Sequence, residues 1–141
     1  MSESIRIENV TICYPHLFEK HAAPGTTNAK YSAEFILDPI RNQESCAAVS
    51  EAFKRVAIAA GKADNLPYMK SPLKNGNQLN EEALSKGRKA RPELEDKMVI
   101  RAGDANYAPS VVSARMQPIG EAQRDQVFGG CIVNAFIDLF Y

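Results

Sequence analysis

Apolar and polar residues alternate along several segments of this chain, and this spacing restricts its fold more than any other feature. In residues 5–14 the apolar positions shift from odd to even numbers around Asn9. A shift of one residue is what a β-bulge introduces, because the extra residue bends the strand and redirects one face. We therefore predict a long first strand that bends near Asn9, ends at Pro15 and is followed by a polar loop over 16–28.

Four further segments alternate in the same way and predict the remaining strands. They cover residues 30–37, 97–101, 110–117 and 131–141. In the last of these we expect Cys131, Val133, Ala135, Ile137 and Leu139 to face the core, with Asn134, Phe136, Asp138 and Phe140 on the second face.

The strongest helical pattern covers residues 43–60, with Asn42 or a neighbour before it and Gly61 after it. Its apolar residues recur every three or four positions and predict one buried stripe, formed by Cys46, Val49, Phe53, Val56 and Ala60. Residues 62–97 are interrupted repeatedly by glycine and proline, and they predict a long basic loop with a short helical turn over 81–86.

The composition is that of a globular domain: of 141 residues, 45% are hydrophobic and 24% are charged. We find neither a run of about 20 apolar residues that would cross a bilayer nor a secretory signal at the start. The three cysteines, Cys13, Cys46 and Cys131, are predicted to be small buried residues in a reducing compartment. Together, the sequence predicts a mainly β fold with one substantial helix: an OB-fold, a five-stranded partly open barrel with long loops, as a single domain over residues 1–141.

Catalytic motifs are not evident, so we predict that the protein is not an enzyme and uses no metal or cofactor. His16 and His21 are expected in an exposed loop, without neighbours at the spacing of a zinc site. Glycine-rich phosphate loops and nucleophile elbows are not found either. A small nuclease would need clustered carboxylates, and Asp96, Asp104 and Glu121 would have to converge in the fold to supply them.

Charge distribution is more informative than net charge. Lys plus Arg equals Asp plus Glu at 17 each, yet residues 62–101 hold 9 basic and 6 acidic side chains. Cations interleaved with aromatic rings are typical of single-stranded nucleic-acid binding, in which cations contact phosphates and rings stack on bases. The predicted phosphate-binding residues are Lys30, Lys70, Lys74, Arg101 and Arg115, and the predicted base-stacking residues are Tyr68, Tyr107 and Tyr31.

Several of these residues have a structural alternative. Tyr31 shares a face with Phe35 and fits the core as well as a stacking role. The run Lys86, Arg88, Lys89 and Arg91 is typical of a solvated surface as well as of a binding site. Phe136 and Phe140 could stack bases, pair with another subunit or pack under the helix, and packing is the default expectation.

Five ordered blocks of this sequence resemble the phage single-stranded DNA-binding proteins first classified as "domain of unknown function 2815", and in particular the member from an enterobacterial phage. The blocks are residues 14–19 (YPHLFE), 30–35 (KYSAEF), 70–76 (KSPLKNG), 101–109 and 129–134 (GGCIVN). The resemblance implies an OB-fold and a protein that coats single-stranded DNA during phage replication and recombination, in the cytoplasm of the infected host. It also implies self-association along DNA.

Two features depart from the family pattern. The strong helix follows the second predicted strand, whereas an OB-fold usually places it between the third and fourth. Such proteins commonly end in an acidic tail that recruits phage or host replication proteins, and we expect that a tail has been removed here. The alternative function is a phage structural or protein-interaction module that assembles through its exposed last strand.

Overall fold

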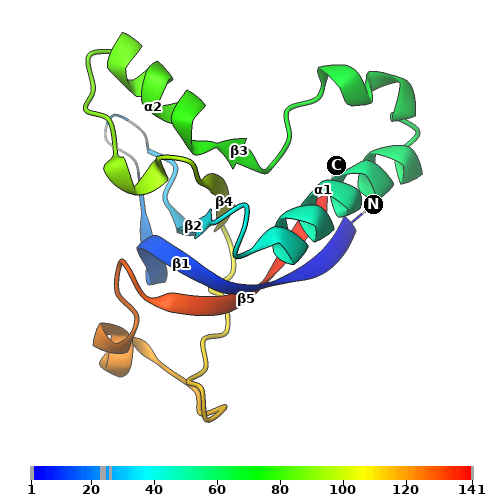
Figure 1. The fold of residues 1–141 in the computed structure, drawn as a ribbon. Helices are drawn as coiled ribbons and strands as arrows, with labels where there is room; N and C mark the ends of the chain where they lie inside the picture. The colour runs from blue at the N-terminus through cyan, green and yellow to red at the C-terminus, as the bar shows by residue number, and fades with distance from the viewer. Residues whose placement is uncertain (1, 23–24, 26, 141) are drawn as a thin grey trace. The chain divides into compact units, whose positions relative to one another are not determined.

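Five strands form one antiparallel sheet that is not closed in this computed structural model, which describes residues 2–22, 25 and 27–140 (Figure 1). The strand order across the sheet is β3-β4-β2-β1-β5. The fold is therefore α+β, with the elements β1 (Ser2–His21), β2 (Lys30–Leu37), α1 (Gln43–Ala59), η1 (Ala63–Tyr68), β3 (Lys74–Asn75), α2 (Gly76–Ser85), η2 (Pro92–Leu94), β4 (Met98–Asp104), η3 (Glu121–Gln126) and β5 (Ile132–Phe140).

The chain divides into two compact units. Unit 1 contains the described residues of 1–10, 36–100 and 133–141, and unit 2 contains those of 11–35 and 101–132. The longest strands contribute residues to both units.

The predicted bend at Asn9 is confirmed. Asn9 has a φ of 54°, and the buried positions change from Ile5 and Ile7 to Val10 at this point. Its backbone groups are bonded by two asparagine side chains: the amide donates to Oδ1 of Asn134 at 2.9 Å, and Nδ2 of Asn42 donates to the carbonyl at 3.1 Å. These bonds matter because a bulge leaves a strand residue without its regular ladder partners.

The predicted end of the first strand at Pro15 is wrong, because β1 continues to His21. Tyr14, the residue before the proline, has a φ of 48°. A local irregularity of this kind is where a strand tolerates proline, which has no amide hydrogen to donate to a ladder. Residues 16–21, for which the sequence predicts a loop, therefore form the last part of a long strand.

Helix α1 confirms the predicted helix almost to the residue. Asn42 precedes it, but its side chain does not cap the helix: Nδ2 donates to the carbonyls of Glu8 and Asn9, which ties the start of α1 to β1. At the other end Gly61 adopts a φ of 75°, a left-handed conformation that glycine adopts without strain. In Figure 1, α1 runs beside the C-terminal part of β5 and the first part of β1.

The core of unit 1 forms between this helix and the strands. The buried helical residues are Ser45, Val49, Ala52, Val56 and Ala57, so the predicted stripe is shifted and Cys46, Phe53 and Ala60 are only half-buried. The other buried apolar residues of unit 1 are Ile5, Ile7, Val10, Ile36, Leu37, Leu94, Val99, Ile100 and Ile137. Unit 2 buries a smaller set, Ile12, Ala33 and Phe35.

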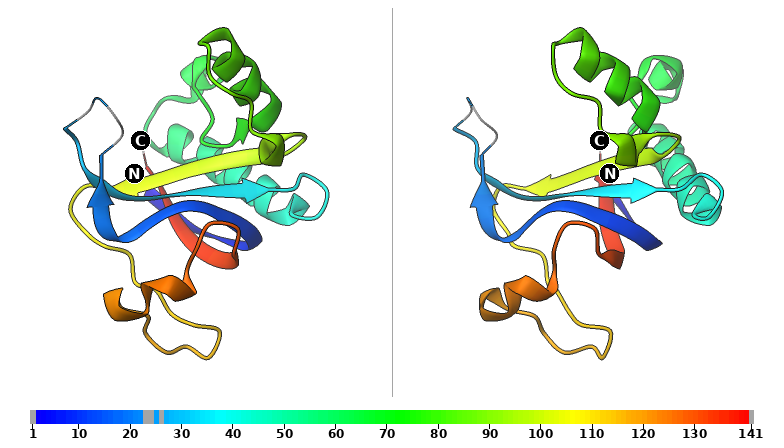
Figure 2. Two further views of the ribbon diagram at one scale, coloured as in Figure 1. Left: turned by 90° about the vertical axis from the view of Figure 1, so that its left-hand side faces the viewer. Right: turned by 60° about the vertical axis from the view of Figure 1, so that its left-hand side comes forward.

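The long loop predicted over 62–97 contains more structure than expected. β3 pairs with β4 through Lys74 opposite Val99, and α2 begins at Gly76 rather than near Glu81. Oδ1 of Asn75 accepts hydrogen bonds from the amides of Asn77 and Gln78, which caps α2. Figure 2 shows β3 and α2 next to the first residues of β4. The cap at Asn75 and the pairing with β4 therefore stabilise regular structure in a segment whose glycine and proline content predicts a loop.

The strand predicted over 110–117 is also wrong. Within this segment Val112 forms an isolated bridge with Pro118, which lies just beyond it. The turn between these two residues is closed by the Ser113 amide, which donates to the carbonyl of Gln117 at 2.9 Å. β3, not this segment, supplies the fifth strand.

The last strand has the predicted faces, although only Ile137 of the inner set is fully buried. Phe136 and Phe140 are 75% and 76% exposed, which overturns the expectation that they pack under the helix. The three cysteines are half-buried rather than enclosed in the core. Over the described residues, none of the helices has the length and apolar character needed to span a bilayer.

Candidate nucleic-acid interface

Unit 2 brings a cation against an aromatic ring where β1 ends and β2 begins. Nζ of Lys20, near the end of β1, lies 5.8 Å from the centroid of the Tyr31 ring. This distance is within the range at which an ammonium group is attracted to the negative face of a ring. Lys20 is exposed and Tyr31 is half-buried, so the pair lies at the surface of the unit.

A second lysine lies beside the same strand ends. A Cβ atom placed on Gly103 of β4 would lie 3.3 Å from Cδ of Lys30 and 3.4 Å from the carbonyl oxygen of Tyr31. The glycine therefore allows the aliphatic part of Lys30 to lie close to the β4 backbone. Lys30 itself is exposed to solvent.

Tyr107 follows β4 on a turn that Asp104 stabilises. One carboxylate oxygen of Asp104 accepts hydrogen bonds from the amides of Asn106 and Tyr107, at 2.8 and 3.0 Å. These two bonds, and to a smaller extent the charge of Lys20, hold the pKa of Asp104 below its usual value. The turn leaves the Tyr107 side chain 76% exposed.

We name Lys20, Lys30, Tyr31 and Tyr107 the Lys–Tyr cluster. All four belong to unit 2 and come from the ends of two neighbouring strands, β1 and β2, and from the turn after β4. Two exposed cations and an exposed ring in one unit are the chemistry that contacts phosphates and bases.

Arg101 is also in unit 2, but its guanidinium group is already paired. Its Nε donates to Oε2 of Glu34 at 3.0 Å, and the Glu34 side chain is only 8% exposed. Arg115 is exposed on the turn closed by Ser113, and its amide donates to Oγ of this serine at 3.3 Å. Of the predicted site residues in unit 2, Lys30 and Tyr31 thus lie beside β4, and Tyr107 lies on the turn that follows this strand.

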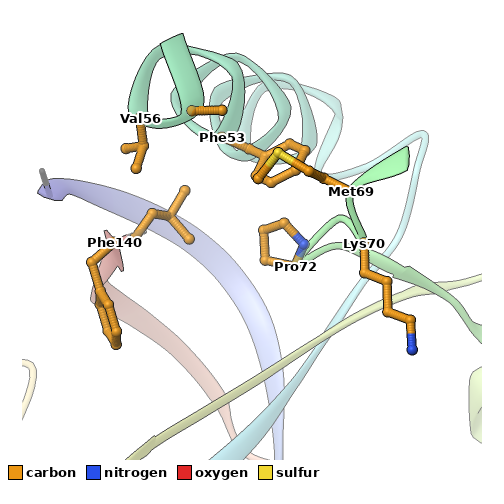
Figure 3. Close-up of a pocket in the computed structure, with 8 residues that line it drawn as sticks. Phe53, Val56, Met69, Lys70, Pro72 and Phe140 are labelled. Atoms are coloured by element: carbon orange, nitrogen blue, oxygen red, sulfur yellow. The ribbon is translucent and has the colours of Figure 1, made fainter. Parts of the chain in front are cut away.

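The other three predicted site residues belong to unit 1. Tyr68 ends η1 with its side chain 87% exposed, and Lys74 is exposed on β3. Lys70 contributes to a cavity of about 240 Å³ that is otherwise lined by apolar residues, among them Phe53, Met69 and Phe140. Figure 3 shows its ammonium end directed away from Phe53.

The two histidines differ from expectation. Both lie in β1 rather than in a loop, and their rings stack with centroids 4.1 Å apart and an interplanar angle of 6°. His16 is half-buried. Its burial, and to a smaller extent the charge of the nearby His21, lower the pKa of His16. Among the residues that the structure describes, no three metal-ligating side chains gather at one place.

Lys20 is the member of the cluster that the sequence did not predict. The sequence predicts a loop after Pro15, so it does not place Lys20 on a strand. One feature of the sequence could have indicated Lys20: it lies just before the connection that leads to Lys30. If β1 extends to this connection, both lysines lie at the same end of the β1–β2 pair.

A comparison with protein families identifies the chain. The model described as "Enterobacter phage Enc34, ssDNA-binding protein" matches residues 3–141, which is nearly the whole sequence. The chain belongs to this family. The resemblance to phage single-stranded DNA-binding proteins inferred from the five sequence blocks is therefore confirmed.

Solved structures of the Enc34 protein share the fold. The structure of the single-stranded DNA-binding protein from bacteriophage Enc34 in complex with ssDNA matches with a TM-score of 0.73 and 19% identity, covering 94% of this chain and 72% of that chain. A C-terminal truncation of the Enc34 protein matches with a TM-score of 0.68, also at 19% identity, covering 94% of this chain and 71% of that one. A search of curated proteins found no match.

Proposed function

We propose that this member of the Enc34 family binds single-stranded DNA through the Lys–Tyr cluster, with little sequence preference. The observation that carries this proposal is the grouping of Lys20 and Lys30 with Tyr31 and the exposed ring of Tyr107 in unit 2. Every base has a flat face on which a ring can stack, so this chemistry does not distinguish sequences. The Enc34 protein crystallised with single-stranded DNA supports the assignment.

The proposed contacts are of two kinds. Phosphates would meet Lys20 and Lys30, and beyond the cluster the predicted cations Lys70, Lys74, Arg101 and Arg115. Bases would stack on Tyr107, with Tyr31 and Tyr68 as the other predicted rings. Stacking contributes about 1–3 kcal/mol per base. Each contacted phosphate contributes about 0.7 to the slope of log affinity against log salt on a single strand.

The biological role that follows is non-enzymatic. We propose that the protein coats single-stranded DNA during phage replication and recombination in the host cytoplasm, and that its sheet is a partly open barrel of the OB type. The bend of β1 supports the barrel relationship, because this strand pairs with β2 on one side and β5 on the other.

The proposal is tested by fluorescence anisotropy with a labelled single-stranded oligonucleotide of mixed sequence, at about 50 and about 200 mM salt. We expect binding at the lower concentration and marked weakening at the higher one. Tyr107→Ala should weaken binding roughly 5- to 150-fold, the equivalent of one lost stacking contact. The loss should be similar for oligonucleotides of different sequence.

Tyr107→Phe is the matched control, because it keeps the ring and should retain most of the affinity. A wild-type protein that leaves the oligonucleotide free at low salt would contradict the function. A wild-type protein that binds, with Tyr107→Ala equally tight, would contradict the site and leave the function standing. Parallel titrations with single-stranded RNA and duplex DNA determine the preference among nucleic acids.

A further inference from the structure

Strand β5 lies at one edge of the sheet and carries large apolar side chains on its outer face. β1 is its neighbour in the strand order, and the order ends at β5. Ile132, Phe136 and Phe140 are 53%, 75% and 76% exposed. An edge strand offers backbone groups to another strand, and proteins usually protect such edges with charges, proline or bulges along the exposed strand. β5 has a single charged residue, Asp138, over its length.

The sequence of β5 is complementary to itself in the antiparallel direction. When two copies pair about Phe136, the middle residue of the strand, Asn134 of each copy lies opposite Asp138 of the other. Ile132 then lies opposite Phe140, and the two Phe136 rings lie opposite each other. Every apolar residue of the outer face thus meets an apolar residue, and every polar residue meets a polar one.

The polar pair in this register is also chemically matched. Oδ1 of Asn134 accepts a hydrogen bond from the amide of Asn9 at 2.9 Å, which orients the side-chain amide. Its Nδ2 group is a donor, and a carboxylate such as that of Asp138 is an acceptor. Opposed residues on paired strands interact directly, because their Cβ atoms lie about 5 Å apart.

We propose that two copies of this protein associate through antiparallel pairing of their β5 strands, centred on Phe136. A second copy fits this face better than nucleic acid does, because the exposed charges of the face are mainly acidic. Asp138 and Glu8 are on exposed positions of β5 and β1, and Arg6, which lies 5.9 Å from the Phe136 ring, is paired with Glu8 at 3.2 Å. These acidic side chains would repel the phosphates of a nucleic acid. A second copy of β5, in contrast, would pair with the strand and cover its apolar residues.

The first test is sedimentation velocity without DNA over a wide range of protein concentrations. We expect a monomer–dimer equilibrium in the wild type and a shift to monomer for Phe136→Lys, which places two cations opposite each other. Leu84→Lys is the control, because it changes a similarly exposed apolar residue on α2, and it should leave the equilibrium unchanged. Circular dichroism checks that each variant is folded.

The second test addresses the register. Asn134→Asp keeps the acceptor for the Asn9 amide but places a carboxylate opposite Asp138 in both symmetric pairs. We expect the dimer dissociation constant to rise roughly 2- to 30-fold, since opposed like charges cost about 0.2–1 kcal/mol per pair. Adding Asp138→Lys to the same chain should reverse the change, because it places an ammonium group opposite each introduced carboxylate.

Three outcomes would overturn the proposal: a wild type that stays monomeric at every concentration, a dimer that is unaffected by Phe136→Lys, or a failure of Asp138→Lys to rescue Asn134→Asp. None of these measurements involves DNA, so they do not depend on the proposed DNA-binding function.

Discussion

Arg101 and Glu34 form an ion pair between neighbouring strands of unit 2, with Nε of the arginine 3.0 Å from Oε2 of the glutamate. The arginine side chain is half exposed, whereas the glutamate side chain is 8% exposed. A carboxylate at this depth requires partners, because burying an unpaired charge is costly. The ion pair with Glu34 therefore gives Arg101 a structural task that competes with the phosphate contact that the sequence predicted for it.

Glu34→Gln separates these two tasks. The substitution keeps the shape of the side chain but removes the charge that holds Arg101, so the guanidinium group becomes available to a phosphate. We expect the slope of log affinity against log salt to steepen by about 0.7 for single-stranded DNA. The protein should lose about 1.5–3 kcal/mol of unfolding free energy, because a charge-assisted hydrogen bond is lost.

The matched control for this experiment is Glu95→Gln, which removes the same charge from an exposed residue of unit 1. Anisotropy titrations over a salt series give the slope, and urea unfolding gives the stability. If both variants change the salt dependence equally, the effect is one of net charge and Arg101 has not been released.

Lys20→Ala tests the member of the cluster that only the structure revealed. Lys20 lies over the Tyr31 ring, so its removal takes away one cation and exposes that ring. We expect weaker binding to single-stranded DNA and a salt slope that is smaller by about 0.7. Lys54→Ala is the comparison, because it removes an exposed lysine from α1, and it should leave the slope unchanged. Equal effects of the two variants would exclude a specific role for Lys20.

Gly76→Ala should destabilise the protein, because the backbone of residues 94 and 97 packs directly against this glycine at the junction of β3 and α2. Its amide donates to the carbonyl of Lys97 at 2.8 Å. An added Cβ atom would overlap the carbonyl oxygen of Leu94 and lie 2.9 Å from that of Lys97. Backbone atoms cannot move aside as a flexible side chain can, so we expect a loss of at least about 1–3 kcal/mol in urea unfolding.

Gly120→Ala is the control for Gly76. Gly120 has a φ of −100°, and the nearest atom to an added Cβ is Oε1 of Gln123 at 3.5 Å. This contact is ordinary, so the control variant should unfold at about the wild-type urea concentration. Similar midpoints for the two alanine variants would show that the region around Gly76 relaxes.

Much of the fold was predictable from local patterns. The bend at Asn9 was visible because a one-residue slip in alternation has few other causes, and α1 was visible because its apolar spacing is regular and Gly61 ends it. The errors came from elements that depend on distant partners. β3 consists of two residues and is a strand because it pairs with β4. Residues 110–117 have the alternation of a strand, but they form only an isolated bridge and no strand pairing.

The candidate site was less predictable than the fold. Lys30 and Tyr107 were selected because of their charge and their irregular surroundings, and the structure places them in one unit with Tyr31. The pairing of Arg101 with Glu34 was not visible, because residues 67 positions apart meet only when β2 and β4 are neighbours. Similarly, Lys20 became a candidate only when β1 was found to continue beyond Pro15.

The stacked histidines predict a loss of stability in mildly acidic solution. Burial, and then the charge of His21, lower the pKa of His16 in the folded chain below the ordinary value of about 6.5. Between the folded and unfolded pKa values the unfolded chain binds more protons, so protonation favours unfolding. The free energy of unfolding should therefore be level above about pH 7.5, fall as the pH drops through about 6.5, and level off below the folded pKa. Urea unfolding at a series of pH values, with an NMR titration of the His16 ring, measures both quantities, and His16→Gln should remove this part of the pH dependence. A His16 ring that titrates at or above the ordinary value would contradict the prediction.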